Sequence, residues 1–159
     1  MRKFERISKE QFEIDVPNGN YEDIIMPVRN TAKSAGYDFH LLTDISIRSG
    51  KSLKIPLGIK VAFNEDEFLG MYVRSSVGIK HNVRLINQVG IFDADYYNNP
   101  GNEGHMWVCL YNHSDVTFKM EKGDRIVQCI FQKFLVTDDD NASGARVGGM
   151  GSTNEEESC

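Results

Sequence analysis

Cysteine is scarce in this chain of 159 residues, which contains only Cys109, Cys129 and Cys159. An odd number of cysteines, two of them inside apolar stretches, argues against a disulfide framework and favours a reducing cytoplasm. Long apolar runs and a signal peptide are also missing from the sequence. Their absence argues against a membrane-spanning helix, so we expect a soluble protein without a membrane anchor.

Positive charge is in deficit as well, because 18 basic residues face 23 acidic ones and give a formal net charge of −5. This balance argues against a general nucleic-acid binder. A polyanionic ligand would have to be bound by a few arginines at specific positions, with or without a metal ion. The four histidines have no metal-site spacing and are expected on the surface or in packing. They are His40, His81, His105 and His113.

Short strands separated by turns account for most of the chain from residue 21 onward. Apolar residues alternate at Ile59 and Val61 and again at Val108 and Leu110, which indicates half-buried strands. Further strands are expected near residues 21–28, 39–47, 71–73 and 126–136. Turn signals at intervals of roughly 8–12 residues are typical of sandwiches and barrels. A chain of this length and apolar content can bury one core, so the prediction is one all-β domain.

One helix is expected before these strands, at about residues 8–16. Ser8 and Gln11 have the spacing of a capping box, and Ile7 and Phe12 occupy the two positions of a hydrophobic staple. We expect this helix to pack on the outside of the domain.

The end of the chain, residues 138–159, differs in composition from the rest. It is rich in glycine and acidic side chains and has few residues that could be buried. Such a segment cannot offset the entropy lost on ordering, so we predict a mobile tail after a domain that covers residues 1–137.

Residues 85–97 are the stretch around which the site is expected to form. The apolar part is interrupted at Gly90 and is followed by Asp93, Asp95 and two tyrosines. This pattern predicts one arm of a hairpin, whose backbone could bind a flat ligand and whose tip would carry a carboxylate. An ordinary hairpin with surface acids is the alternative.

Five short stretches, taken together, carry a resemblance to a known family. They are residues 35–38 (AGYD), 74–78 (RSSVG), 87–96 (NQVGIFDADY), 123–128 (GDRIVQ) and 146–153 (RVGGMGST). In order, content and spacing they resemble the five motifs of the trimeric dUTP pyrophosphatases, or dUTPases. The N-terminal helix and the long turn at 98–104 look most like the versions in Gram-positive bacteria and their phages. The resemblance implies a jelly-roll or β-clip barrel.

The resemblance implies that Asp93 is the general base that deprotonates the attacking water, a role that contributes about 10²–10⁴-fold to rate. A turn-capping acid is the alternative for this residue. Asp95 could form a metal pair with Asp93, but in this family magnesium is held by the triphosphate and water without a direct protein ligand. We therefore expect Asp95 to be structural and Mg²⁺ to accompany the substrate.

The nucleoside is expected to lie against the same stretch. The ring of Tyr96 would leave no room for a 2′-hydroxyl, whereas Tyr97 fits a half-buried packing residue better. Steric exclusion is needed because an apolar surface alone rejects an added hydroxyl weakly. The uracil edge would be read by Asn87 and by the backbone near Gly90, Ile91 and Phe92, with Trp107 possible across the hairpin. Met150 stands where the family usually places an aromatic ring over the base.

The phosphates are assigned to three other motifs. Arg74 ends a strand before a short predicted helix, and helix starts and guanidinium groups both suit phosphate oxygens. The full set of expected phosphate residues is Arg74, Ser75, Ser76, Gln128, Arg146, Gly151, Ser152 and Thr153. The family usually has a glycine at position 76. Asp38 and Arg125 are expected to form a buried structural pair, and a plain glycine linker is the alternative reading of the tail motif.

The predicted function is hydrolysis of dUTP to dUMP and pyrophosphate by water attack on the α-phosphorus. The resemblance implies a cytoplasmic homotrimer in which phosphate motifs, uracil hairpin and tail come from different subunits. Two alternatives remain: a dCTP deaminase-type relative, and a dUTPase-like regulatory protein that binds a partner protein. The catalytic glutamate setting of the deaminases, Thr-Leu-Glu, is missing from the sequence after the hairpin.

Overall fold

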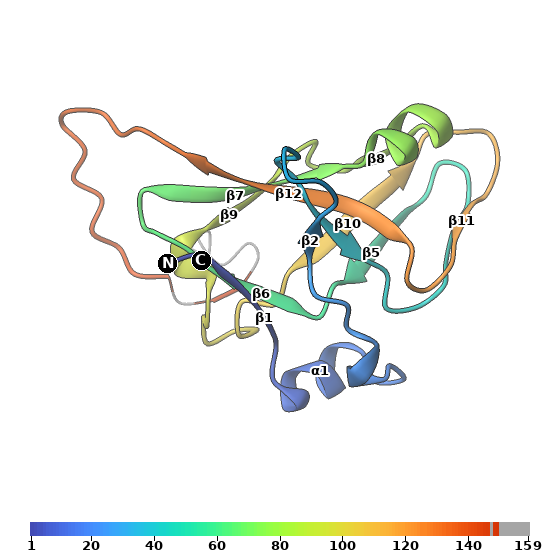
Figure 1. The fold of residues 1–159 in the computed structure, drawn as a ribbon, viewed down its shortest axis with the longest axis horizontal. Coiled ribbons are helices and arrows are strands. Elements are labelled where there is room, and N and C mark those ends of the chain that lie inside the picture. Colours follow the sequence, from blue (N-terminus) through green and yellow to red (C-terminus); the bar gives the residue numbers. More distant parts are fainter. Residues whose placement is uncertain (147, 150–159) are drawn as a thin grey trace, which may run out of the picture.

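The fold is an assembly of short β-strands with one α-helix at its lower edge (Figure 1). It is seen in a computed structural model that describes residues 1–146, 148 and 149. The strands are β1 (Lys3–Arg6), β2 (Val28–Arg29), β3 (Tyr37–His40), β4 (Ile45–Ile47), β5 (Ser52–Pro56), β6 (Ile59–Ala62), β7 (Glu67–Val73), β8 (Val83–Leu85), β9 (Gly90–Asp93), β10 (Trp107–Asn112), β11 (Phe118–Met120) and β12 (Arg125–Lys133). The all-β class is confirmed.

The largest sheet has the strand order β2-β3-β12-β7-β9. Its central strand β12 pairs antiparallel with β3 on one side and β7 on the other. Ile126, Val127 and Cys129 of β12 are each fully buried. Because successive side chains of a strand point to opposite faces, apolar residues lie on both faces of β12.

A second sheet has the order β5-β10-β8 and faces the first across the core. Alternate residues of β10 point into the core, so Val108 and Leu110 are buried while Cys109 is only partly covered. Asn112 continues the buried series although it is polar. Its side-chain amide donates to the carbonyls of Ile47 at 2.8 Å and Val116 at 2.7 Å, which satisfies the buried group. Two small pairs, β1-β6 and β11-β4, complete the strands described.

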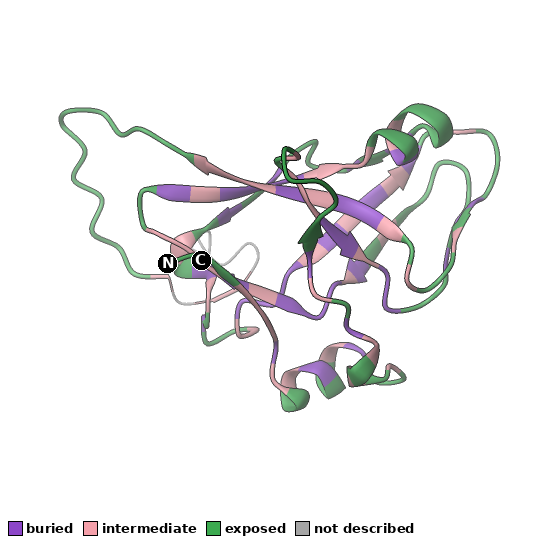
Figure 2. Cartoon of the chain, viewed as in Figure 1, coloured by how far each residue is buried: buried purple, intermediate pink, exposed green. Residues whose placement is uncertain are grey.

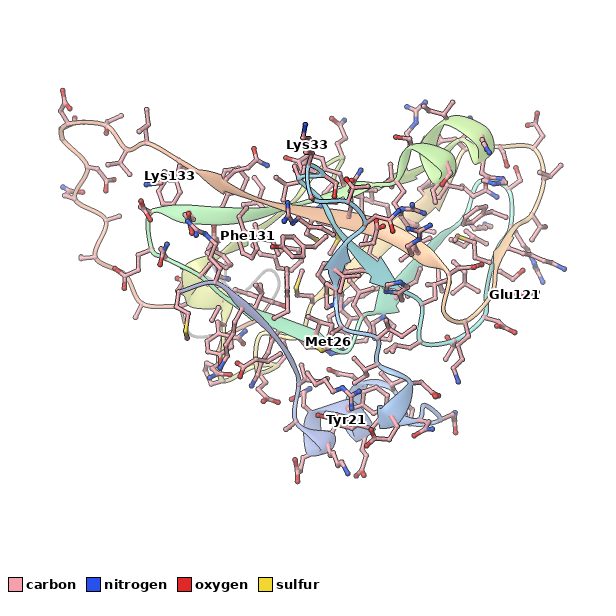
Figure 3. The ribbon with its side chains drawn as sticks, in the orientation of Figure 1. Tyr21, Met26, Lys33, Glu121, Phe131 and Lys133 are labelled. Carbon is pink, nitrogen blue, oxygen red and sulfur yellow. The ribbon has the colours of Figure 1, made fainter. Side chains whose placement is uncertain are left out.

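The predicted N-terminal helix is confirmed as α1 (Lys9–Asp15), with Ser8 as its cap. The Ser8 hydroxyl accepts a hydrogen bond from the Gln11 amide at 3.1 Å. Ile7 and Phe12 are both buried, as a hydrophobic staple requires. Tyr21 closes the outer side of α1: its ring meets Phe12 edge-on at 5.5 Å, and Figure 3 shows it beside the helix.

Two strand predictions near the N-terminus are wrong. The expected strand at 21–28 is the 3-10 turn η1 (Tyr21–Asp23), followed only later by β2. Asn20 caps this turn by accepting from the Glu22 amide at 3.2 Å, a local bond that competes with strand pairing. The expected strand at 39–47 is divided into β3 and β4 by a turn at residues 41–44.

The prediction that residues 85–97 form one arm of a hairpin is also wrong, because this stretch is divided into the two strands β8 and β9. β8 joins the sheet of β10, whereas β9 is the edge strand beside β7, so the two successive strands lie in different sheets. The reversal lies between them at residues 86–89, and Asp93 ends β9 instead of lying at a hairpin tip. Within the described residues, no sheet closes into a barrel.

Residues 134–146 leave the end of β12 as a long loop and return to the region after β9 (Figure 1). The loop contains neither helix nor strand, and Figure 2 shows it almost wholly exposed. Leu135 is 97% exposed, so this segment adds little to the core. The helices described here are all too short or too polar to cross a membrane.

Candidate active site

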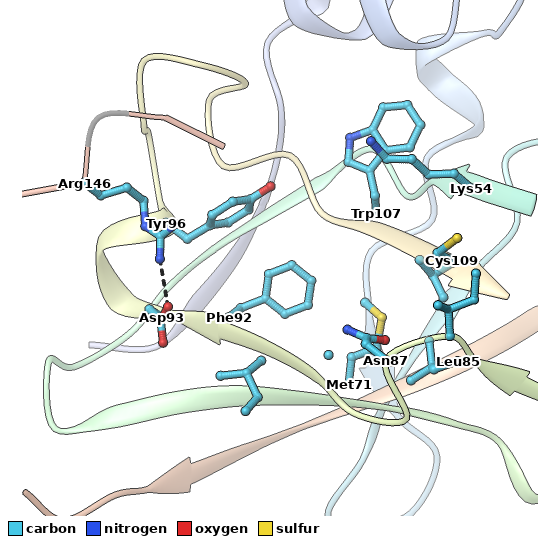
Figure 4. Close-up of a pocket in the computed structure, with 14 residues that line it drawn as sticks. Lys54, Met71, Leu85, Asn87, Phe92, Asp93, Tyr96, Trp107, Cys109 and Arg146 are labelled. Atoms are coloured by element: carbon cyan, nitrogen blue, oxygen red, sulfur yellow. Dashed lines mark hydrogen bonds and ion pairs between the residues drawn. The ribbon is translucent and has the colours of Figure 1, made fainter. Parts of the chain in front are cut away.

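A cavity of about 460 Å³ lies between the two main sheets. Its lining residues are Lys54, Met71, Leu85, Ile86, Asn87, Gly90, Ile91, Phe92, Asp93, Tyr96, Trp107, Val108, Cys109 and Arg146. Figure 4 shows Arg146 and Asp93 at one end and Cys109 at the other, with Phe92 between them. An apolar cavity with a few polar groups is typical of a small-molecule site.

The reversal between β8 and β9 forms one wall of this cavity. Gln88 has a positive φ of 63°, and the Val89 amide donates to the Asn87 carbonyl at 2.6 Å, which together close a tight turn. Gly90 then packs against β7, where a Cβ would stand only 3.2 Å from the Cβ of Met71. The absence of a side chain at Gly90 lets β9 approach β7. Asn87, in the turn before β9, lines the cavity.

β10 and β5 supply the opposite wall. Cys109 and Lys54 are directly paired across the two strands and therefore project from the same face, toward the cavity. The Lys54 ammonium lies 4.6 Å from the centre of the Trp107 ring. The sequence motifs did not identify Lys54, Cys109 or Met71, since each lies outside the five stretches and meets the cavity only through strand pairing.

Asp93 lies at the end of β9, where the chain turns into the 3-10 helix η3 (Ala94–Tyr96). Its side chain is 55% exposed, so solvent water can reach it. Arg146 Nη2 donates to Asp93 Oδ2 at 2.8 Å, and Arg146 Nε donates to Asp95 Oδ1 at 2.8 Å. Asp95 thus contacts the arginine of the tail, and its structural role stays a prediction.

Tyr96 is the most enclosed polar residue of the cavity, at 5% exposure. Its hydroxyl donates to the His105 carbonyl at 3.0 Å and accepts from the Asn102 side chain at 2.8 Å. Burial raises the pKa of this phenol above its ordinary value, so it stays protonated and able to donate. Tyr97 is half-buried outside the cavity and hydrogen-bonds Glu5, as its predicted packing role requires.

His105 connects Tyr96 to the N-terminal helix. Its Nδ1 lies 2.5 Å from Asp15 Oδ2, and its Nε2 accepts from the Gly58 amide at 2.9 Å. The Nε2 contact assigns the ring proton to Nδ1, which therefore donates to Asp15. Burial is the main cause that lowers the pKa of His105. Both ring nitrogens are occupied, so this histidine is a packing residue, as predicted.

The residues predicted for phosphate form a second, shallower cavity of about 290 Å³. Its lining is Asn30, Ser34, Gly36, Asp38, Arg74, Ser75, Ser76 and Gln128. The structure therefore brings four of the predicted phosphate residues together. A Cβ at Gly36 would stand 2.4 Å from the side-chain oxygen of Gln128, so a larger residue there would displace the Gln128 side chain.

Asp38 organises this second cavity. Its two carboxylate oxygens accept from Arg74 Nε at 3.0 Å and from Arg125 Nη1 at 3.1 Å. The expected pair of Asp38 and Arg125 is thus confirmed, and Arg74 is added to it. Arg74 precedes the π-helical turn η2 (Ser76–Lys80), and its carbonyl accepts from the amides of Val77 and Gly78 at 2.9 and 3.0 Å. Ser75 and Ser76 lie exposed at the start of this turn.

The two cavities share no lining residue among those described. The structure does not bring Arg74 and Gln128 to Asp93 within one chain. It brings Arg146 to Asp93 of the same chain. The expectation that the tail reaches the pocket of a different subunit stays a prediction. The remaining predicted residues of the tail, Met150, Gly151, Ser152 and Thr153, lie outside the described residues.

A metal site built from side chains is not present in the described part of the chain. No group of three or more histidine, cysteine, aspartate or glutamate residues there could hold an ion. Asp93 and Asp95, the pair considered from the sequence, are both engaged by Arg146.

The fold and the site together define a jelly-roll-type β protein with a small-molecule pocket edged by an acid and an arginine. Residues 22–154 match the family model described as dUTPase, so the chain belongs to the dUTPase family. It is 46% identical over 132 residues to the deoxyuridine 5′-triphosphate nucleotidohydrolase of Lactococcus lactis, covering 82% of this chain and 88% of the relative.

Solved structures agree with this assignment. The dUTPase of Streptococcus mutans is 38% identical, with a TM-score of 0.72 over 85% of this chain and 98% of that chain. The dUTPase from phage phi11 of S. aureus has a TM-score of 0.68 over 91% of this chain and 97% of that chain. At 16% identity, the phage structure shows likeness of fold alone. The expected jelly-roll fold and family are confirmed.

Proposed function

We propose that this protein hydrolyses dUTP to dUMP and pyrophosphate. The observation that supports it most is the position of Asp93: a solvent-accessible carboxylate at the edge of an apolar cavity, beside a buried tyrosine and the arginine of the tail. Membership of the dUTPase family and the names of the Lactococcus and Streptococcus relatives support the same substrate.

In the proposed reaction, Asp93 accepts a proton from water while the water oxygen bonds to the α-phosphorus. The bond from that phosphorus to the bridging oxygen breaks, and pyrophosphate leaves with the electron pair. Asp93 then releases its proton to solvent. Proton transfer to a positioned side chain of this kind increases the reaction rate by about 10²–10⁴-fold. Arg146 and Arg74 stabilise negative charge on the phosphates during transfer.

The substrate is the magnesium complex of dUTP, in which the ion neutralises part of the triphosphate charge. The described residues offer no cluster of ligands for a bare ion, so we assign the ion to the triphosphate and water. A structural Mg(II) ion is named for a mutant dUTPase of phage phi11.

Base recognition is assigned to the turn between β8 and β9. Asn87 and the backbone of Gly90, Ile91 and Phe92 line the cavity and can present fixed donors and acceptors to the pyrimidine edge. Uracil and cytosine reverse the donor and acceptor pattern at N3 and C4, so fixed backbone groups distinguish them. Tyr96 forms the wall toward the sugar, and Trp107 lies across the cavity from the turn.

We infer a homotrimer in which the phosphate cavity of one subunit completes the pocket of another. The separation of the two cavities within one chain supports this: Arg74, Ser75, Ser76 and Gln128 line one, and Asp93 lines the other. The tail motif, with Arg146, is assigned to the pocket of a different subunit, as the resemblance implies. We also place the protein in the cytoplasm, which the unpaired cysteines Cys109 and Cys129 support.

Incubation with each deoxynucleoside triphosphate and UTP, followed by chromatographic separation of products, tests the proposal. We expect dUMP and pyrophosphate from dUTP with Mg²⁺, and little product from dCTP, dTTP or UTP. Formation of dUTP from dCTP would identify a deaminase instead. Absence of turnover with dUTP, at a protein concentration that binds dUMP, would contradict an enzymatic role and favour a protein that binds a regulatory partner.

A further inference from the structure

The second cavity, which carries the predicted phosphate residues, has one wall outside the five sequence motifs. Asn30 and Ser34 form this wall, and both belong to the loop that joins β2 to β3. The loop is labelled at Lys33 in Figure 3, at the top of the view. No sequence pattern assigned these residues to a site, so their place at the cavity is a product of the fold.

Strand register explains how the loop reaches the cavity. Val28 of β2 and Gln128 of β12 both lie directly opposite Asp38 of β3. Residues paired in this way project from the same face of a sheet. Asn30 follows Val28 by two positions and therefore returns to that face, where it lines the cavity beside Gly36.

Hydrogen bonds within the loop hold it in shape. Arg29 Nη1 donates to the carbonyls of Ala32 at 3.1 Å and Ser34 at 2.9 Å. The Ser34 amide donates to the Thr31 hydroxyl at 3.1 Å, and the Ser34 hydroxyl donates to the Thr31 carbonyl at 3.0 Å. These bonds place Asn30 at the cavity before a ligand binds, which lowers the entropic cost of binding.

The side-chain amide of Asn30 keeps its hydrogen-bonding groups for a ligand. The residue is exposed, and its side chain forms no hydrogen bond within the described part of the chain. The hydroxyl of Ser34, by contrast, is occupied by Thr31. An asparagine amide offers two N–H donors and one acceptor oxygen. Asn30 can therefore bind a ligand in the cavity without giving up a bond to the protein.

The charge of the cavity indicates which ligand this is. Asp38 is the only acidic residue among the described residues that line it. Its carboxylate is paired with both Arg74 and Arg125, so two guanidinium groups and one carboxylate leave one positive charge. Hydrogen bonds from N–H donors to an ionised acceptor are stronger than those to a neutral one. The cavity therefore favours an anion with several oxygen acceptors, such as a phosphate.

We propose that Asn30 is a further phosphate-binding residue, whose amide donates to the part of the substrate that leaves as pyrophosphate. The proposal rests on the function proposed above. In that reaction the α-phosphorus must lie at Asp93, which lines the other cavity. The phosphates that enter the second cavity furthest are then those beyond the α-phosphate. Asn30 binds them from the side opposite to the motif residues.

Calorimetric titration of the full-length protein with magnesium pyrophosphate tests the proposal without a nucleotide. Asn30→Ala should weaken binding about tenfold, the size expected for one lost hydrogen bond to a charged group. Asn30→Asp keeps the shape but brings a carboxylate to the phosphates, so it should bind more weakly than the alanine variant. The matched control is Asn18→Ala, since Asn18 is exposed and its side chain has no hydrogen bond among the described residues. The control should bind as the wild type does.

Three results would overturn the assignment of Asn30. They are wild-type affinity for pyrophosphate in Asn30→Ala, binding by Asn30→Asp as tight as by Asn30→Ala, and an equal loss of affinity for dUMP. The last result counts because dUMP lacks the two phosphates that Asn30 is proposed to bind.

Arg74→Gln separates this inference from the proposed function. We expect it to weaken pyrophosphate binding as well. If Arg74→Gln weakens binding and Asn30→Ala does not, the cavity binds phosphate and only the assignment of Asn30 is wrong. If neither variant changes the affinity, the second cavity does not bind the phosphates, and both proposals for it are wrong.

Discussion

The side-chain amide of Asn102 donates a 2.8 Å hydrogen bond to the hydroxyl of Tyr96. Asn102 belongs to the long turn between η3 and β10, which is tied to itself by bonds from Asn99 and to the N-terminal helix through His105 and Asp15. The tyrosine assigned to the sugar is thus oriented by a turn outside the motif that contains it. Its hydroxyl is occupied by protein, which leaves the ring as the surface that meets the ligand.

Replacement of Tyr96 tests this division between ring and hydroxyl. Tyr96→Ala should reduce the ratio of kcat/KM for dUTP over UTP at least tenfold, because the wall against the 2′-oxygen is removed. Tyr96→Phe keeps the ring and should retain most of the ratio while lowering stability by about 1–3 kcal/mol, since buried partners of the hydroxyl are left unsatisfied. An unchanged ratio in the alanine variant would place sugar discrimination elsewhere.

Asp93→Asn tests the general base. The amide cannot accept the water proton, so turnover of dUTP should fall at least about 100-fold, the lower end for a lost base. Because the side chain is 55% exposed, the fold should persist, and dUMP affinity should stay within a few-fold. Asp115→Asn serves as the control for a lost surface charge. Turnover close to wild type in the Asp93 variant would refute the assignment.

The sequence predicted those parts of the fold and site that depend on neighbours along the chain. The cap of α1 by Ser8, the short helix after Arg74 and the strands β6, β10 and β12 follow from local spacing and alternation. The five motifs located some of the residues that line each cavity, among them Asp93 and Tyr96 in one and Arg74 and Gln128 in the other. Their order is a property of the chain, so it can be recognised without knowing how the strands pair.

What the sequence did not predict depends on pairing between distant strands. Residues 85–97 are predicted as one arm of a hairpin because apolar residues recur along them, but the stretch divides into β8 and β9, which pair in different sheets with β10 and β7 respectively. Lys54 was not predicted as a cavity residue for the same reason, because it reaches the cavity only through the pairing of β5 with β10. The contact between Arg146 and Asp93 joins residues far apart in the chain, and no local pattern records it.

His105 makes stability depend on pH. Burial lowers the pKa of His105 in the folded chain below its unfolded value of 6.5. At a pH between these two values, the unfolded chain binds a proton at this histidine and the folded chain does not. The contribution of the neutral histidine to the free energy of unfolding is therefore complete above about pH 6.5. It decreases as the pH falls toward the lowered pKa of the folded chain. Tm measured from pH 7.5 to 5.5 should fall accordingly.

His105→Gln provides the control for this titration. The variant should be less stable at pH 7.5 by about 1–3 kcal/mol, since glutamine cannot serve both Asp15 and the Gly58 amide. The decrease in Tm of this variant between pH 7.5 and 5.5 should be smaller than that of the wild type. Some loss will remain, because burial also lowers the pKa of His40. An equal slope in both proteins would show that His105 does not govern the acid response.

Truncation after Asp140 separates folding from function. Residues 134–146 contain no helix or strand and are nearly bare, and the fragment removed holds little that a core could use. The shortened chain should therefore fold and assemble with Tm within about 2–4 °C of the full chain, the range that corresponds to 1 kcal/mol at this size. A larger fall would show that the tail belongs to the folded domain and that the predicted limit at residue 137 is wrong.

Activity should respond quite differently to the same truncation. The fragment removed carries Arg146 and the predicted donors Gly151, Ser152 and Thr153, all assigned to the triphosphate. We expect hydrolysis of dUTP to fall by at least 100-fold while dUMP, which lacks the distal phosphates, binds within a few-fold of wild type. In the full chain, a non-hydrolysable dUTP analogue should slow trypsin cleavage after Arg146, because the phosphates add contacts to the guanidinium. dUMP should give no such protection. Retained hydrolysis in the shortened chain, or protection by dUMP equal to that by the analogue, would mean that the tail does not bind the distal phosphates.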